Sequence, residues 1–410
     1  MNNPPLLFAA NPTASPRVVI RFPFFRILLI TLLAVGPSFG QDRPALDSRA
    51  VENRLIPLTR SGADSGSYQT IYERMKALNV PGVSIAVFDN GEISWVKGYG
   101  LSDIVQAEPV DPATRFQAAS LSKPVTSVAA FRLVEKQMLS LDEDVNLKLR
   151  RWKVPENEYT AGEKVTLRRI VSHTAGLTVH GFAGYRPGDP LPTVVDILDG
   201  IPPANSAPVR VKQIPGEKES YSGGGFTVLQ LLLEDVTGKP FGALVEELVL
   251  QPVGMKQSTF RRPPPGGKAS RAANGYEGNG RMVEGGYRVY PELAAAGLWT
   301  TPSDLARFML DVSASYRADK GILRQTTVRQ MLTKIPGAGG LGFGVDGSGE
   351  TIRFRHSGGN AGFSCYAVAF ARTGRGVVIM TNSDNGTPLI HELIRAVARE
   401  YHWPPMWPRE

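Results

Sequence analysis

Two serine–lysine pairs in the chain have a spacing that could support nucleophilic catalysis. Ser120 and Lys123 stand in FQAASLSKPVTSVAAFRL, and Ser94 and Lys97 stand in EISWVKGYG. A serine hydroxyl becomes a good nucleophile when a neighbouring base accepts its proton, and lysine can be that base if its surroundings lower its pKa. The secondary structure on which each pair lies decides which of them can react.

The sequences around the two pairs predict different secondary structure. Residues 83–97 alternate in polarity around an Asp-Asn-Gly turn, which predicts a β-hairpin. In a strand an odd separation places Ser94 and Lys97 on opposite faces, so they cannot cooperate. The apolar residues after Ser120 recur with helical spacing, and positions i and i+3 share a helix face. We therefore predict Ser120–Lys123 as the reactive pair, although a lone Ser-x-x-Lys is more often a capping serine beside a surface lysine.

The elements that must position this pair come from both ends of the chain. A helix is predicted over 68–78, with Tyr68, Ile71, Tyr72, Met75 and Leu78 on one face. A second hairpin is predicted over 365–382, followed by a closing helix over 389–401. Hairpins at both ends without βαβ repeats predict an α/β fold of the α+β type: an antiparallel sheet flanked by helices, with a mostly helical region at about 120–290 inserted between its halves.

The N-terminal segment predicts export. Residues 1–40 contain three arginines, then the apolar run ILLITLLAV and small residues, which is the pattern of a signal peptide cleaved near Gln41. An uncleaved membrane anchor is the alternative, but nine apolar residues are too few to span a bilayer. We expect a linker over 41–67 and a catalytic domain over 68–403, in a periplasmic or secreted protein.

The composition excludes several functions. Of the 410 residues, 42% are hydrophobic and 20% charged, which is typical of a globular protein. The single cysteine, Cys365, cannot form an internal disulfide, and the scattered basic residues do not make a nucleic-acid footprint. The five histidines show no metal-ligand spacing. We expect no metal and no organic cofactor.

Beyond the Ser-x-x-Lys pair, the chain resembles the serine β-lactamase and penicillin-binding protein superfamily, in particular its class C-like branch. That branch includes D-alanyl-D-alanine carboxypeptidases, D-aminopeptidases and family VIII carboxylesterases. The resemblance covers about Tyr68 to Tyr401 and rests on seven landmarks in the family's order: FQAASLSKPVTSVA, SLDEDVNLKL, IVSHTAGL, PGEKESYSGGGF, QPVGMKQSTF, AAAGLWTTPSDLARFM and RHSGGNAGF. Each is weak alone, and together they imply a β-lactamase/transpeptidase-like fold. His173 in the third landmark is interpreted as structural.

The second catalytic element that the resemblance implies is Tyr221-Ser222-Gly223, in place of the family's Tyr-x-Asn. The resemblance implies that Tyr221 acts as a general base and acid, and that nearby lysine charge stabilises its phenolate form. Tyr221 is expected in a loop before a helix that begins near Phe226. Without the resemblance, a tyrosine packed under that loop would be the simpler interpretation. Gly223 departs from the family's Asn, which binds the amide side chain of β-lactams and peptides. This departure weakens the β-lactamase interpretation and favours esters.

The third element is His356-Ser357-Gly358, where the family has Lys-Thr-Gly or His-Thr-Gly. It follows the short predicted strand TIRFR and is expected to bind substrate, although His356 could also be an ordinary hydrogen-bonded histidine. The resemblance implies an oxyanion hole formed by the backbone N–H groups of Ser120 and Gly359. A competing match, Arg372-Thr373-Gly374, falls in a hairpin turn.

These observations predict an exported serine acyl hydrolase that works through a Ser120 acyl-enzyme. Its substrate would be an ester, a β-lactam or a D-amino-acid peptide. The alternative is a penicillin-binding or wall-binding sensor that acylates with little turnover.

Overall fold

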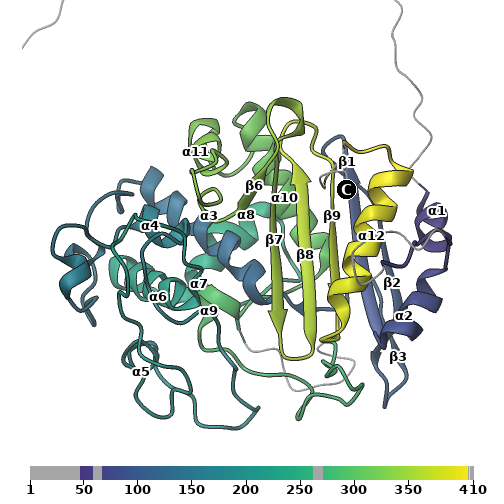
Figure 1. Cartoon of the computed structure of the whole chain (residues 1–410), viewed down its shortest axis with the longest axis horizontal. Helices are drawn as coiled ribbons and strands as arrows, with labels where there is room; N and C mark the ends of the chain where they lie inside the picture. Colours follow the sequence, from purple (N-terminus) through teal and green to yellow (C-terminus); the bar gives the residue numbers. More distant parts are fainter. Residues whose placement is uncertain (1–46, 59–66, 262–270, 405, 407–410) are drawn as a thin grey trace, which may run out of the picture. The chain divides into compact units, whose positions relative to one another are not determined.

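A seven-stranded antiparallel sheet with the order β3-β2-β1-β9-β8-β7-β6 forms the centre of the structure. The computed structural model describes residues 47–58, 67–261, 271–404 and 406, and all of them fall within one compact unit. Strands from the two ends of the chain meet where β1 pairs with β9, which confirms the predicted fold class (Figure 1). The strands are β1 (Gly82–Asp89), β2 (Glu92–Asp103), β3 (Glu108–Pro109), β6 (Gly344–Asp346), β7 (Arg353–Asn360), β8 (Phe363–Phe370) and β9 (Gly376–Thr381).

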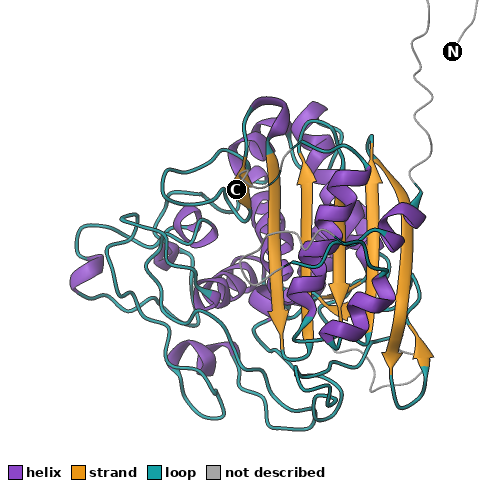
Figure 2. Cartoon of the chain, turned by 45° about the vertical axis from the view of Figure 1, so that its right-hand side comes forward, coloured by secondary structure: helices purple, strands orange, loops and turns teal. Residues whose placement is uncertain are grey.

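Helices cover both faces of this sheet, as Figures 1 and 2 show. Along β1 the side chains of Val83, Ile85 and Val87 join the core under α12, whereas Ala86 and Phe88 join the core on the opposite face. This alternation follows from the two-residue period of a strand, and it explains why β1 is apolar on both sides. One face carries α1 (Ser48–Asn53), α2 (Ile71–Leu78) and α12 (Gly386–Glu400), and the other carries α10 (Pro302–Ala318).

The N-terminal part of the described chain packs against α12. The predicted linker region contains α1, of which Val51 is buried, and Leu55 is buried just after it. In α2, Ile71 and Met75 are buried, but Tyr72 is 62% exposed. The predicted apolar face is therefore wrong at its tyrosines, Tyr68 being exposed as well. The physical reason is that Arg74 occupies the inward side of α2 in their place.

The helical region lies between β3 and β6, as predicted, and begins and ends at a small two-stranded sheet. In that sheet β4 (Phe116–Gln117) pairs with β5 (Trp299–Thr300), so that residues about 180 positions apart meet just before Ser120. The region contains α3 (Ser122–Glu135), α4 (Leu167–Val171), α5 (Val194–Asp199), α6 (Gly223–Thr237), α7 (Phe241–Val245), the π-turn η4 (Glu246–Leu250), α8 (Gln251–Val253) and α9 (Leu293–Ala296). Helix α11 (Gln325–Met331) follows α10.

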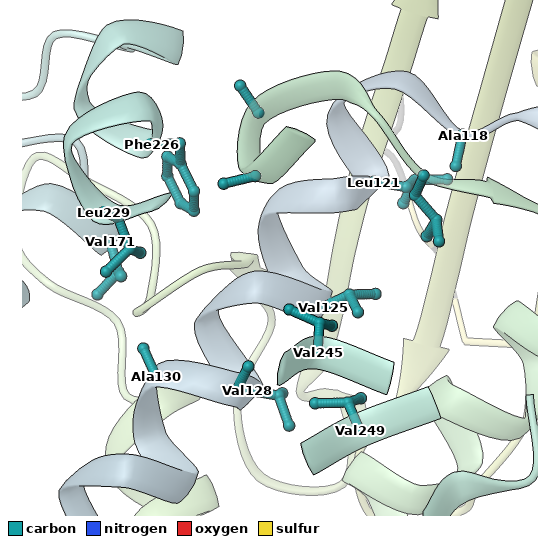
Figure 3. Packing of buried hydrophobic residues seen from close by; sticks show 14 of the residues in the cluster. Ala118, Leu121, Val125, Val128, Ala130, Val171, Phe226, Leu229, Val245 and Val249 are labelled. Carbon is teal, nitrogen blue, oxygen red and sulfur yellow. The ribbon is translucent and has the colours of Figure 1, made fainter. Parts of the chain in front are cut away.

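Helix α3 is the centre of this region. Its side chains are buried on almost every side, because α7, η4 and α9 pack against it and Phe226 of α6 lies near Lys123 in its first turn (Figure 3). Val125 and Val128 pack toward Val245 and Val249, and Ala130 faces Val171. A helix enclosed in this way holds its first residues rigidly. The predicted reactive pair lies at that N-terminal end.

A buried ion pair joins α2 to α12 and offers a test of the packing on this face. Arg74 donates two hydrogen bonds of 2.8 Å to the carboxylate of Glu392, whose side chain is 1% exposed. Removing one partner of a buried pair leaves the other charge uncompensated, which typically costs about 3–5 kcal/mol. We expect Glu392→Ala to lower the free energy of unfolding by roughly that amount in a denaturant titration.

The matched control is Lys164→Ala, which breaks a surface pair with Glu156. It should leave the unfolding midpoint almost unchanged, because water already solvates both charges. Equal midpoints for the two variants would show that the Arg74–Glu392 pair does not hold α2 in place.

Candidate active site

Ser120 lies in a strained turn that precedes α3. The turn η1 (Ala119–Leu121) has Ala119 at φ 48°, a left-handed conformation that is uncommon for a residue with a side chain. Ser122 holds it there: its hydroxyl donates to the Ala119 carbonyl at 2.6 Å and accepts from the Leu298 N–H at 3.0 Å. Strain of this kind persists only where the surroundings determine it, and it is concentrated at functional sites.

Lys123 is brought against Ser120 as the sequence predicts. Its Nζ lies 2.9 Å from Ser120 Oγ and 2.9 Å from the carbonyl oxygen of Ala295 in α9. The side chain is 2% exposed, and burial lowers its pKa to about 7. A large fraction of the amine is therefore neutral near pH 7 and can accept the serine proton.

The other serine–lysine pair is not built for catalysis. Lys97 binds Glu52 at 2.8 Å, and Ser94 is exposed on β2. Both residues lie on β2, as predicted, where a β-bulge leaves Ser94 without a partner position on β1.

Tyr221 lines the same cavity as Ser120 and lies beside the lysine. Lys123 Nζ is 4.9 Å from the centre of the Tyr221 ring. Burial raises the pKa of Tyr221 to about 12, and the nearby Ser120 hydroxyl lowers it by a smaller amount. A pKa of about 12 favours the protonated form of Tyr221 at neutral pH, whereas the resemblance implies a phenolate. Lys123 is the group prepared to accept a proton, and Tyr221 is the group prepared to donate one.

Tyr221 precedes α6 by two residues, and His173 positions it. The His173 ring stacks on the Tyr221 ring with centres 4.2 Å apart, and its Nδ1 accepts the backbone N–H of Ser222 at 3.1 Å. Burial and the nearby Lys123 charge hold the pKa of His173 well below its usual value, so the ring stays neutral and Nδ1 stays an acceptor. The landmark IVSHTAGL indicated only that His173 has a structural role. The sequence did not indicate that His173 contacts Tyr221.

Gly223 opens α6 rather than lying in a loop before it. Ser222 is the N-cap, and its hydroxyl accepts the Gly225 N–H at 2.8 Å. The glycines at 223–225 therefore form the first helical turn, and the predicted start near Phe226 is three residues late. Glycine is a weak helix former, which is why the sequence suggested a loop.

The third element lies within β7, which extends to Asn360 and is longer than the predicted TIRFR strand. A Cβ on Gly358 would lie 2.4 Å from the Ala118 carbonyl oxygen, so only glycine lets β7 approach the Ser120 turn. The next residue, Gly359, has open space where its side chain would be and lines the same cavity as Ser120. The competing Arg372-Thr373-Gly374 lies in the turn between β8 and β9, as expected.

His356 also lines the cavity, together with Ser357, and its ring centre is 6.3 Å from that of Tyr221. Burial and the charge of Lys123 lower the pKa of His356 to about 3. At neutral pH it is an uncharged ring, unlike the lysine that the family often carries there. It cannot attract a substrate carboxylate by charge.

The cavity has a volume of about 720 Å³ and opens to solvent. Ser120, Lys123, Tyr221 and His356 share it with residues that sequence reasoning did not select, chiefly His180 and Phe182 from the loop before α5. Within the described ranges no group of three or more His, Cys, Asp or Glu side chains is arranged to hold a metal ion. In the same residues no helix is both long and apolar enough to cross a membrane.

Comparison with known proteins identifies the family and the fold of the chain. A family model described as "Beta-lactamase" matches residues 69–401. Protein flp of Staphylococcus aureus (strain N315) is 24% identical over an alignment of 319 residues, with 74% of this chain and 60% of that protein covered. The chain therefore spans less than two thirds of the length of this curated relative.

Two solved structures share the fold. The octameric penicillin-binding protein homologue from Pyrococcus abyssi has a TM-score of 0.66 and 24% identity, over 82% of this chain and 76% of that one. D-amino acid amidase from Ochrobactrum anthropi SV3, complexed with L-phenylalanine, has a TM-score of 0.65 and 22% identity, over 81% and 97%.

The pH dependence of the rate tests the role of Lys123. Because only the neutral amine can accept the serine proton, kcat/KM should rise with pH through a midpoint near the pKa of about 7. The pKa values of His173 and His356 are lowered too far for their titration to produce this rise in kcat/KM. The measurement is a pH–rate profile of any substrate that the protein turns over.

Two variants complete this test. His180→Asn should keep the midpoint, since this exposed histidine touches the ring of Tyr221 and not the amine. Lys123→Met should lose the activity. A profile that is flat from about pH 5 to about pH 9 would remove Lys123 as the base.

Proposed function

The chain belongs to the Beta-lactamase family, and from this premise we propose that it is an exported serine acyl hydrolase whose preferred substrates are esters. The observation that carries the proposal is the contact of Lys123 Nζ with Ser120 Oγ at 2.9 Å, in a site where burial brings the lysine pKa to about 7. A serine hydroxyl that shares a hydrogen bond with a buried, partly neutral amine in a cavity is an activated nucleophile.

The proposed reaction gives each of these groups a role in the acylation step. Neutral Lys123 accepts the proton as Ser120 Oγ bonds to the substrate carbonyl carbon, and the N–H groups of Ser120 and Gly359 stabilise the oxyanion. The C–O bond to the leaving group then breaks, and Tyr221 donates the proton that the leaving alkoxide needs. Lys123 returns a proton to Tyr221. Water then attacks the acyl-enzyme, and the Lys123–Tyr221 pair accepts its proton and restores the Ser120 hydroxyl.

The preference for esters rests on what the cavity lacks. Gly223 offers no side-chain amide to hold an amide or β-lactam substrate, and neutral His356 adds no charge for a terminal carboxylate to a cavity that Lys334 and Arg355 also line. Neutral esters need neither contact. The Ochrobactrum structure named above is that of an amidase, so amides remain the comparison class in the test.

A substrate screen with two serine variants tests the proposal. We expect purified protein to hydrolyse short-chain aryl esters faster than a chromogenic cephalosporin or a D-amino-acid amide, and to carry an acyl group on Ser120 detectable by mass spectrometry. Ser120→Ala should abolish turnover, a loss of about 10⁴-fold or more. Ser94→Ala is the control and should keep near-normal rates.

Two results would redirect the assignment. Equal losses in both folded serine variants would remove Ser120 as the nucleophile. An adduct on Ser120 that persists for hours without turnover would instead indicate a penicillin-binding or wall-binding sensor.

Export is a separate part of the proposal, and it rests on residues 1–40, which lie outside the described residues. The short apolar run between basic and small residues predicts cleavage, so the mature N-terminus should lie near Gln41. N-terminal sequencing of protein from the periplasmic or secreted fraction checks this. Recovery of the intact Met1 form in the membrane fraction would show an anchor instead.

A further inference from the structure

The ring of Phe182 lies where a side chain on residue 223 would otherwise extend. A Cβ on Gly223 would be 3.0 Å from Phe182 Cε2 and 3.1 Å from the His180 carbonyl oxygen, closer than side chains normally approach. Phe182 is half-buried, packs against the main core and lines the cavity that contains Ser120. The space beside Gly223, where the family has an Asn side chain, is therefore not empty, because the Phe182 ring lies next to it.

The loop that carries this ring is fixed to the first turn of α6. Gly223 N–H donates to the His180 carbonyl at 3.1 Å, and Gly224 N–H donates to the Val179 carbonyl at 2.9 Å. A Cβ on Gly224 would lie 2.7 Å from the Thr178 carbonyl oxygen, so this approach also requires glycine.

The position of the loop carries a backbone cost. Val179 has φ 63°, a conformation in which a β-branched residue is a strong outlier. The fold thus holds the loop against α6 despite local strain, and Phe182 keeps a defined place on the cavity wall.

Phe182 continues an aromatic surface that begins at the catalytic tyrosine. The His180 ring lies 4.8 Å from the Tyr221 ring, and the Phe182 ring follows beside Gly223. Aromatic faces on a water-exposed cavity wall bind flat apolar groups by burial and by offset or edge-to-face packing.

We propose that Phe182 is a specificity-determining residue that binds an apolar, preferably aromatic, group of the substrate next to the scissile carbonyl. The inference rests on the proposed acyl hydrolase function and names the substrate class: esters with an aryl or large apolar group. Glycine at 223 is the condition for this binding surface.

The first test compares esters that differ only in the apolar group. One series keeps the p-nitrophenolate leaving group and changes the acyl part from acetyl to phenylacetyl. The other keeps the acetyl group and changes the alcohol from ethanol to benzyl alcohol. In at least one series, Phe182→Ala should lower kcat/KM for the aromatic member relative to the small member by roughly 10-fold. Phe182→Leu should lose less, because it retains apolar contact.

Gly223→Asn should shift the same ratio in the same direction, since its side chain displaces the Phe182 ring. Tyr72→Ala is the matched control, because it removes an exposed aromatic ring on α2, far along the chain from the cavity residues, and should leave the ratio unchanged. An unchanged ratio in both series for folded Phe182→Ala overturns the inference, while wild-type turnover that still depends on Ser120 leaves the proposed function standing.

A binding measurement keeps the inference testable even without turnover. In the Ser120→Ala background, N-benzylacetamide should bind more weakly by roughly 10-fold when Phe182 is also changed to Ala. Equal affinity with and without the Phe182 ring would contradict the inference whatever the catalytic results are.

Discussion

The burial of the Lys123 amine is the constraint on which the rest of the site depends. A charged amine that is removed from water without a carboxylate partner is unstable, and in the described part of the chain Lys123 forms no ion pair. Its contacts are the Ser120 hydroxyl, the Ala295 carbonyl and the rings of Tyr221 and Phe226. These groups tolerate either protonation state, so the energetic cost appears as a lowered pKa. Burial is thus what makes the lysine a base.

The same amine influences the protonation of its neighbours. Its charge adds to burial in keeping His173 and His356 neutral. A neutral His173 can accept the Ser222 N–H and hold Tyr221 in place, and a neutral His356 adds no positive charge to the cavity, which Lys334 and Arg355 also line. The pKa of Tyr221 is raised because burial outweighs the smaller effect of the nearby Ser120 hydroxyl. Burial and the lysine charge together thus make Lys123 the proton acceptor and Tyr221 the proton donor.

Close backbone approach at glycine is the second feature that shapes the cavity. At Gly358 it brings β7 against the turn of Ser120, and at Gly223 and Gly224 it brings the 178–182 loop against α6. In each place a Cβ would collide with a carbonyl oxygen or a ring. The first approach places Gly359 beside the nucleophile, and the second places His180 and Phe182 beside Tyr221.

The sequence by itself determined the features that local periodicity controls. It identified both hairpins, the inserted helical region and the Ser120–Lys123 pair, because a strand separates residues three apart and a helix brings them together. It did not determine the start of α6, because three glycines weaken the helical signal. Nor did it determine the inward side of α2, which an ion pair with Glu392 decides.

Only the tertiary structure decided the chemistry of the site. The pKa of Lys123 depends on burial by α6 and α9, and its contact with Ala295 spans 172 residues. The stacking of His173 on Tyr221 and the position of Phe182 beside Gly223 likewise join segments that are distant in sequence. Desolvation and close packing depend on what surrounds a residue in space. A pattern of residue types along the chain does not contain that information.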